Sequence, residues 1–206
     1  MTSDVSKVPT RAVLTRIPDS WAWMAPDLLR RLLPFGLLVA VVEIGWRPPW
    51  LGLSPGRVGA QLVFALIAAP LLFAAATLVQ LRLARRRGAL SVPAGGGDAW
   101  FQAGFYAVNG PIEEALFRGL IQGGIAIAFG APLGFIAGTA TYVLYHRLGW
   151  PWAETLATAL LGIPVGLAFW LLPGPPSLLG VSLVHIAATC GFLGPGPYLL
   201  KKLGFV

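Results

Sequence analysis

The sequence predicts an all-α membrane protein, a polytopic helix bundle of about six transmembrane spans with both termini in the cytoplasm. Of its 206 residues, 56% are apolar and only 11% are charged, whereas a soluble domain carries about 25% charged residues. The apolar residues lie in runs that are too long for ordinary core helices. The basic residues cluster at the ends of those runs, as orienting charges do in membrane proteins. These observations exclude a water-soluble globule.

The net charge of +7 does not indicate nucleic-acid binding, because the basic residues form no continuous stripe. The single cysteine, Cys190, excludes an intrachain disulfide and a metal site of the CxxC type. Arginine is far more frequent than lysine, which is typical of a GC-rich bacterial genome. We therefore expect a protein of the bacterial plasma membrane.

The first half of the chain contains two predicted spans. Residues 1–31 are mixed and polar, and they lack the cleavage site of a signal peptide. The apolar runs at 32–46 and 58–81 are the first two spans, and an arginine block at 82–87 ends the second. Pro93 and a glycine tract then predict a flexible linker over 88–97. This linker divides the chain into an N-terminal part (1–97), a core (98–195) and a short tail (196–206).

The core contains the four remaining spans. Residues 98–129 predict one kinked helix, or an interfacial helix that leads into a span, with Pro111 at the junction. The last three runs are 133–150, 155–172 and 178–193. With this topology, 12 of the 15 basic residues fall on the cytoplasmic side, in agreement with the positive-inside rule.

Ionisable residues inside spans are the candidates for function, because each costs about 2.5–3.5 kcal/mol at the centre of a helix in lipid. Three of the predicted spans contain such residues or polar neighbours of them. They are Glu113, Glu114 and Arg118 in the third span, Tyr142 and His146 in the fourth, and His185 and Thr189 in the sixth.

The spacing of these residues predicts that they converge. Glu114 and Arg118 are four residues apart, so they form an ion pair on one helix face. Glu113 points about 100° away, and we expect it to be free for proton transfer as a general base. Tyr142 and His146, and likewise His185 and Thr189, have the same spacing. The three faces meet only if the helices enclose a small wet cavity.

Each feature alone also has a structural explanation. The Glu114–Arg118 pair would then fix helix packing, each histidine would bond a neighbouring helix, and the Tyr142 hydroxyl would merely hold His146. The combination of two acids, an arginine and two histidines in three spans favours a functional site. Gly119, Gly123 and Gly124, which follow the acidic pair, predict close helix approach.

The segment from Glu113 to Gly119 resembles the EExxxR motif of the type II CAAX prenyl endopeptidases, within the wider family of CAAX proteases and bacteriocin-processing enzymes. That family continues with an FxxxH helix and an HxxxN helix, and Tyr142–His146 and His185–Thr189 stand at the corresponding places. The resemblance covers residues 98–195. Tyr142 replaces a phenylalanine, and Thr189 replaces an asparagine, which removes a side-chain amide.

This resemblance implies an intramembrane glutamate peptidase that acts on a membrane-associated peptide or lipidated protein. Glu113 and His146 would activate the attacking water, and His185 with position 189 would stabilise the oxyanion. Glu114, Arg118 and Tyr142 would support the site. We expect no cofactor: two histidines and two glutamates are potential zinc ligands, but the sequence has no HExxH motif and Arg118 is close by.

Two other functions stay open. The first is a non-catalytic membrane partner, since Thr189 in place of asparagine would fit a loss of activity. The second is a proton-coupled carrier, in which the intramembrane acids and histidines would relay protons. The absence of an inverted repeat from the sequence argues against the carrier.

Overall fold

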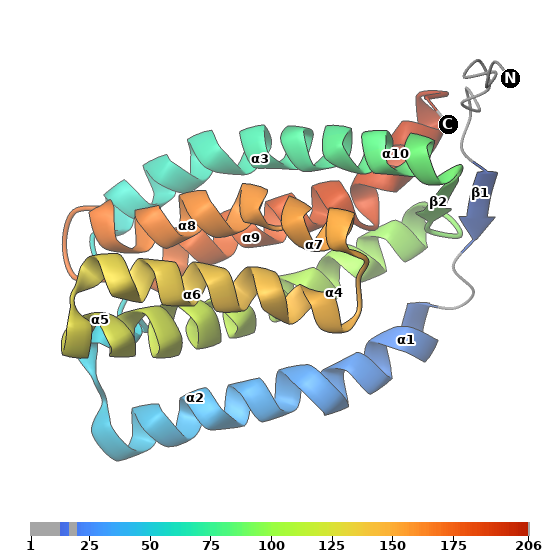
Figure 1. Cartoon of the computed structure of the whole chain (residues 1–206). Coiled ribbons are helices and arrows are strands. Elements are labelled where there is room, and N and C mark those ends of the chain that lie inside the picture. Colours follow the sequence, from blue (N-terminus) through green and yellow to red (C-terminus); the bar gives the residue numbers. More distant parts are fainter. Residues whose placement is uncertain (1–12, 17–19, 206) are drawn as a thin grey trace, which may run out of the picture.

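The computed structural model describes residues 13–16 and 20–205 and is mostly helical (Figure 1). The first half contains β1 (Val13–Arg16), α1 (Ser20–Asp27), the π-helical segment η1 (Leu28–Leu32), α2 (Leu33–Trp46), the short 3₁₀ turn η2 (Pro49–Leu51), α3 (Val58–Arg87) and β2 (Ala89–Val92). The second half contains α4 (Gly96–Glu114), the π-helical segment η3 (Ala115–Gly123), α5 (Gly124–Phe129), α6 (Ala131–Tyr145), η4 (His146–Leu148), α7 (Trp152–Ala157), α8 (Ala159–Leu171), α9 (Leu178–Phe192) and α10 (Pro195–Lys202).

The helices form a bundle around α9 and η3. The long helix α3 packs along α9, and α4 packs on another side of α9. Helix α6 lies against η3, α5 and α8, while α2 runs along the outside and contacts η3 and α4 (Figure 1). The strands and α10 gather at one end of the bundle (Figure 1). This arrangement brings the predicted third, fourth and sixth spans together.

Apolar side chains cover the outside of the bundle, and polar side chains lie inside it. Ile44 on α2 and Leu66 on α3 are 79% and 75% exposed. In contrast, Gln122, Glu114 and Arg118 are 0% exposed. A surface of this kind suits hydrocarbon, and buried ionisable groups in a membrane protein face the interior of the bundle. The distribution agrees with the membrane class that the composition predicts.

Within the described residues, two segments are long and apolar enough to cross a membrane, namely Val58–Arg87 and Trp152–Leu171. The pair α9 and α10, bent by 42° at its break, adds a third if it is one span. Helices α2 and α6, with 14 and 15 residues, are shorter. The six-span count and the cytoplasmic termini therefore stay predictions, and the basic residues Lys7 and Arg11 lie outside the described residues.

The flexible linker predicted over residues 88–97 is wrong. Residues Ala89–Val92 form β2, which pairs in parallel with β1 in the register Val13↔Ala89. Leu90 and Val92 are 0% exposed and belong to a small core with Leu81, Ala84 and Leu200. Helix α4 begins at Gly96, inside the glycine tract. The alternation of Leu90 and Val92 with polar Ser91 places both apolar side chains in this core.

The interruption predicted at Pro111 lies further along the chain. Helix α4 continues through Pro111 to Glu114, and the irregular backbone follows it as the π-helical segment η3. Gly110 permits close packing here, because a Cβ at this position would lie 3.0 Å from Ile186 Cγ1 on α9. Widened turns of the π type are frequent at functional sites. Glu113 and Glu114 are thus the last residues before a change of helix geometry.

The glycines after the acidic pair pack against a loop segment. A Cβ on Gly119 would lie 2.5 Å from the backbone oxygen of Leu51, and one on Gly123 would lie 2.6 Å from that of Trp50. A Cβ on Gly124 would meet Trp50 only at 3.6 Å, which is ordinary contact. Close approach is confirmed at Gly119 and Gly123, but the partner is η2 and not a long helix.

This difference gives a matched pair of variants. We expect Gly119→Ala to destabilise the protein by about 1–3 kcal/mol, the usual cost of overpacking, because a backbone carbonyl cannot move aside easily. Gly124→Ala has room for its methyl group and should leave stability unchanged or slightly higher. Thermal unfolding of both variants in detergent measures the difference, and equal melting temperatures would contradict this account of the packing.

Candidate active site

Five of the polar residues singled out in the sequence line one cavity of about 410 Å³. They are Glu113, Tyr142, His146, His185 and Thr189, which come from α4, α6, η4 and α9. Glu114 and Arg118 lie behind the cavity wall and are fully buried. The predicted convergence of the three helix faces is confirmed.

The Glu114–Arg118 ion pair predicted from the spacing is present. Arg118 Nε donates to Glu114 Oε2 over 3.2 Å, and both side chains are 0% exposed. Arg118 Nη1 donates to Gln122 Oε1 at 3.3 Å and to Thr139 Oγ1 at 3.2 Å. Gln122 Nε2 in turn donates to the backbone oxygen of Gly166 over 2.7 Å. Arg118 therefore joins η3 to α6 directly and to α8 through Gln122.

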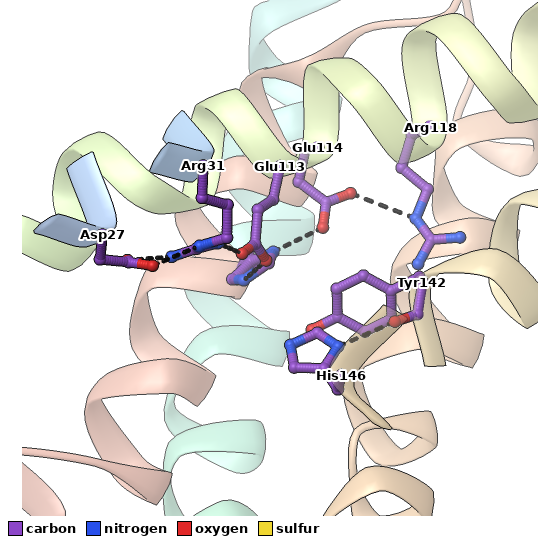
Figure 2. A network of polar contacts seen from close by, with 8 residues as sticks. Asp27, Arg31, Glu113, Glu114, Arg118, Tyr142 and His146 are labelled. Carbon is purple, nitrogen blue, oxygen red and sulfur yellow. Dashed lines mark hydrogen bonds and ion pairs between the residues drawn. The ribbon is translucent and has the colours of Figure 1, made fainter. Parts of the chain in front are cut away.

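Glu113 has a cationic partner, contrary to the prediction that it is free. Arg31, from η1, donates through Nη1 to Glu113 Oε1. Arg31 Nε also donates to Asp27 Oδ1 over 2.8 Å. Figure 2 shows Asp27, Arg31 and Glu113 in a row that enters the site from the N-terminal helix. The spacing argument missed this contact because it considers only residues of one helix, and Arg31 is 82 positions away.

A second polar cluster holds the helix that carries Arg31. The Ser20 hydroxyl donates to Asp98 Oδ1, and Gln102 Nε2 donates to Ser20 Oγ over 2.8 Å. The rings of Trp23 and Phe105 pack edge to face at 5.5 Å. These contacts fix α1 against α4, and they thereby set the position of η1 over Glu113.

Removal of the Arg31 guanidinium should therefore destabilise the protein. Arg31→Ala leaves the buried Glu113 carboxylate without its guanidinium, and an unsatisfied buried group costs about 1–3 kcal/mol or more when it is charged. Arg30→Ala is the matched control, because Arg30 is the adjacent arginine and its side chain is exposed. Thermal unfolding in detergent should show a lower midpoint for Arg31→Ala only. Equal midpoints would mean that the Arg31–Glu113 contact adds nothing to stability.

His146 is held in one orientation by the turn that precedes it. Its Nδ1–H donates to the backbone oxygen of Tyr142 over 2.8 Å. Because a carbonyl oxygen only accepts hydrogen bonds, the neutral ring carries its lone pair on Nε2. The rings of Tyr142 and Trp150 lie 4.8 and 4.9 Å from the imidazole. The structural alternative, in which the Tyr142 hydroxyl holds His146, is wrong, since the backbone carbonyl does so.

The Tyr142 ring joins the three motifs. It packs edge to face with His185 at 5.8 Å and with Phe117 at 5.4 Å. The Arg118 guanidinium lies 5.2 Å from its centroid, which is a favourable cation–π distance. Tyr142 is 2% exposed. Its ring therefore acts as the spacer that separates Arg118 from the cavity.

His185 lies between the two adjacent glutamates. Its Nδ1–H donates to Glu114 Oε1 over 2.6 Å, and its Nε2 lies 3.4 Å from Glu113 Oε2. The first contact fixes the ring. The second is longer than a good hydrogen bond, so the Nε2 edge remains available to a group in the cavity. Thr189 lies one helical turn further along α9 and lines the same cavity.

Sequence reasoning missed several polar residues of this region. Gln122 lies four residues after Arg118, and Asn109 lies four residues before Glu113. The same four-residue spacing, continued by one turn in each direction, therefore predicts both. Arg31 and Asp27 give no such signal, because their contact with the site depends on the tertiary fold.

The residues described by the structure contain no group of three or more His, Cys, Asp or Glu side chains arranged to hold a metal ion. Both carboxylates of the site instead have guanidinium partners, Arg31 for Glu113 and Arg118 for Glu114. Figure 2 shows the carboxylates of the two pairs on the same helical segment. His185 contacts the carboxylate of each pair.

One family model matches the part of the chain that contains both glutamates of the site. No curated protein and no solved structure matches the chain. Residues 95–190 match the family model described as type II CAAX prenyl endopeptidase, Rce1-like. This range contains both glutamates, Arg118 and both histidines, in the order of the three motifs. This part, a little under half of the chain, is similar to the Rce1-like type II CAAX prenyl endopeptidases.

Proposed function

We propose that the protein is an intramembrane endopeptidase of the CAAX type that cleaves a membrane-associated peptide or a lipidated protein. We further propose that it crosses the plasma membrane six times, with both termini in the cytoplasm. One observation carries the activity: Glu113, His146 and His185 come from separate helices and line one cavity inside an apolar bundle. The family match supports the reaction class.

In the proposed mechanism, water is activated by Glu113 and His146. The Glu113 carboxylate accepts a proton as the water oxygen attacks the peptide carbonyl carbon, and His146 Nε2 orients the water as a hydrogen-bond acceptor. The carbonyl oxygen becomes negatively charged, and His185 in its imidazolium form, which keeps Nδ1–H on Glu114, donates its Nε2–H to that oxygen. The carbon–nitrogen bond then breaks, and the proton held by Glu113 passes to the leaving nitrogen.

Glu114, Arg118 and Tyr142 support this chemistry without touching the reacting atoms. Glu114 fixes the His185 ring through the 2.6 Å hydrogen bond, and Arg118 fixes Glu114. We propose that the reaction uses no metal, which the pairing of each carboxylate with a guanidinium supports. Addition of a chelator to the purified protein tests this point: activity that disappears, and then returns with zinc, would overturn it.

The activity itself is tested with the purified protein in liposomes. Two fluorogenic peptides of one sequence are compared. In both, a cysteine is the fourth residue from the free carboxyl end; this cysteine is farnesylated in one peptide and unmodified in the other. Cleavage of either peptide, located by mass spectrometry, supports the proposed reaction, and the comparison measures the contribution of the lipid.

Two features favour the alternative of a non-catalytic membrane partner, namely Thr189 and the contact of Arg31 with Glu113.

A further inference from the structure

Asn109 is a buried polar residue that the mechanism above does not use. It lies on α4, one turn before Glu113, and is 5% exposed. Its Oδ1 is buried and has no hydrogen-bond partner. The residue lines the same cavity as Glu113 and His185. A buried carboxamide oxygen without a partner is unusual, because most buried polar groups form hydrogen bonds.

The packing of α4 on α9 places Asn109 opposite Thr189. Along the first part of α4, Gln102 and Tyr106 lie against Gly194, two residues beyond the end of α9. Further along α4, Gly110 lies against Ile186, and Glu114 bonds His185.

As the residue numbers rise along α4, those of the contacting residues in α9 and just beyond it fall. The two helices are therefore antiparallel. Asn109 and Glu113 are one turn apart on α4, and Thr189 and His185 are one turn apart on α9. In an antiparallel pair with Glu113 beside His185, Asn109 faces Thr189. Both residues line the cavity.

The lack of a partner argues against a purely structural role for Asn109. A buried polar atom without a hydrogen bond costs about 1–3 kcal/mol of stability, and an apolar residue of similar size would avoid this cost. The carboxamide also presents a donor and an acceptor to whatever it faces, since Nδ2 and Oδ1 exchange places on rotation by half a turn. A peptide group supplies the complementary pair.

We propose that Asn109 is a further catalytic residue, whose Nδ2–H donates a hydrogen bond to the oxygen of the scissile carbonyl. This inference rests on the proposed peptidase function. As the water oxygen bonds to the carbonyl carbon, the electron pair of the C=O bond moves to that oxygen. His185 and Asn109 then stabilise the negative charge from α9 and α4. Thr189, with a single short hydroxyl group, faces Asn109 and leaves room for its carboxamide.

The test measures kcat and KM in the liposome assay with the farnesylated peptide. Asn109→Ala and the volume-matched Asn109→Leu should both lower kcat by about 10² to 10³-fold, the typical effect of losing one oxyanion donor, with little change in KM. Their thermal unfolding should occur at or above the wild-type temperature, because no hydrogen bond of Oδ1 is lost. Val108→Ala is the control, because Val108 is the neighbouring residue, is exposed, and does not line the cavity.

A second substitution makes the test specific. Thr189→Asn introduces a carboxamide opposite position 109, and it should restore at least part of the kcat lost in Asn109→Ala. A kcat equal to that of Val108→Ala would overturn the proposal. Two other results would also overturn it. One is a loss of activity in Asn109→Ala accompanied by a lower unfolding temperature, and the other is wild-type activity in Asn109→Leu. Either result would mean that Asn109 acts through packing.

Glu113→Gln separates this inference from the proposed function. If Glu113→Gln abolishes cleavage and Asn109→Ala does not lower it, only the role of Asn109 is refuted. If the wild type cleaves neither peptide, or Glu113→Gln cleaves as fast as the wild type, the proposed function is refuted and the role of Asn109 with it.

Discussion

Glu113→Gln is expected to abolish peptide cleavage and to leave the fold nearly intact. Loss of a general base typically costs about 10² to 10⁴ in rate. Glutamine cannot take the proton from water, but its carboxamide oxygen still accepts the hydrogen bond from Arg31. Arg31 also retains Asp27 as a partner. Initial cleavage rates in liposomes and thermal unfolding in detergent measure the two effects.

This variant also separates an enzyme from a non-catalytic partner. If the protein acts only by binding, Glu113→Gln should keep its biological effect in cells, since shape and hydrogen bonding are preserved. A matched change at a residue outside the cavity, Glu43→Gln, should alter neither cleavage nor folding. Cleavage by Glu113→Gln at the wild-type rate would refute the role of Glu113 as base.

Glu114→Gln and Arg118→Ala should instead destabilise the protein strongly. Both side chains are 0% exposed, and each is the charged partner of the other. Removal of one member of a buried pair costs about 3–5 kcal/mol, because the remaining charge is left uncompensated. Glu114→Gln also removes a charged partner of His185. We therefore expect both variants to lose protein level in membranes together with activity, whereas Glu113→Gln loses activity alone.

A double-mutant cycle tests whether this cost comes from the pair. In Glu114→Gln combined with Arg118→Ala, neither charge remains, so the double variant should be less destabilised than the sum of Glu114→Gln and Arg118→Ala. Unfolding of the purified proteins in detergent gives the three values. Additive losses would show that Glu114 and Arg118 act independently, against the contact in the structure.

The sequence predicts the helices of this fold better than their pairing. Apolar runs such as 58–81 and 178–193 coincide with α3 and α9, because the hydrophobicity of a segment is a local property. The sequence predicts a linker in place of the strand Ala89–Val92, because the glycines beside it indicate flexibility and its partner β1 is far away in the chain. Strand pairing at such a separation depends on the tertiary fold.

The same distinction explains the site. The Glu114–Arg118 pair follows from four-residue spacing, so the sequence predicts it. The contact between Arg31 and Glu113 depends on the position of α1 against α4. The hydrogen bonds of Ser20 with Asp98 and Gln102 fix that position. The orientation of His146 depends on a hydrogen bond to a backbone carbonyl. Every residue has such a carbonyl, so the residue types in the sequence do not predict this orientation.

The Asp27–Arg31 pair has a consequence for the order in which the protein is made. Arg31 leaves the ribosome 82 residues before Glu113, which at a synthesis rate of about 5–20 residues per second is a delay of about 4–16 s. During that interval, Asp27 at the preceding turn is the one partner of Arg31 in the described network that already exists. We therefore expect the local pair to offset the charge of Arg31 until α4 is synthesised and Glu113 becomes its second partner.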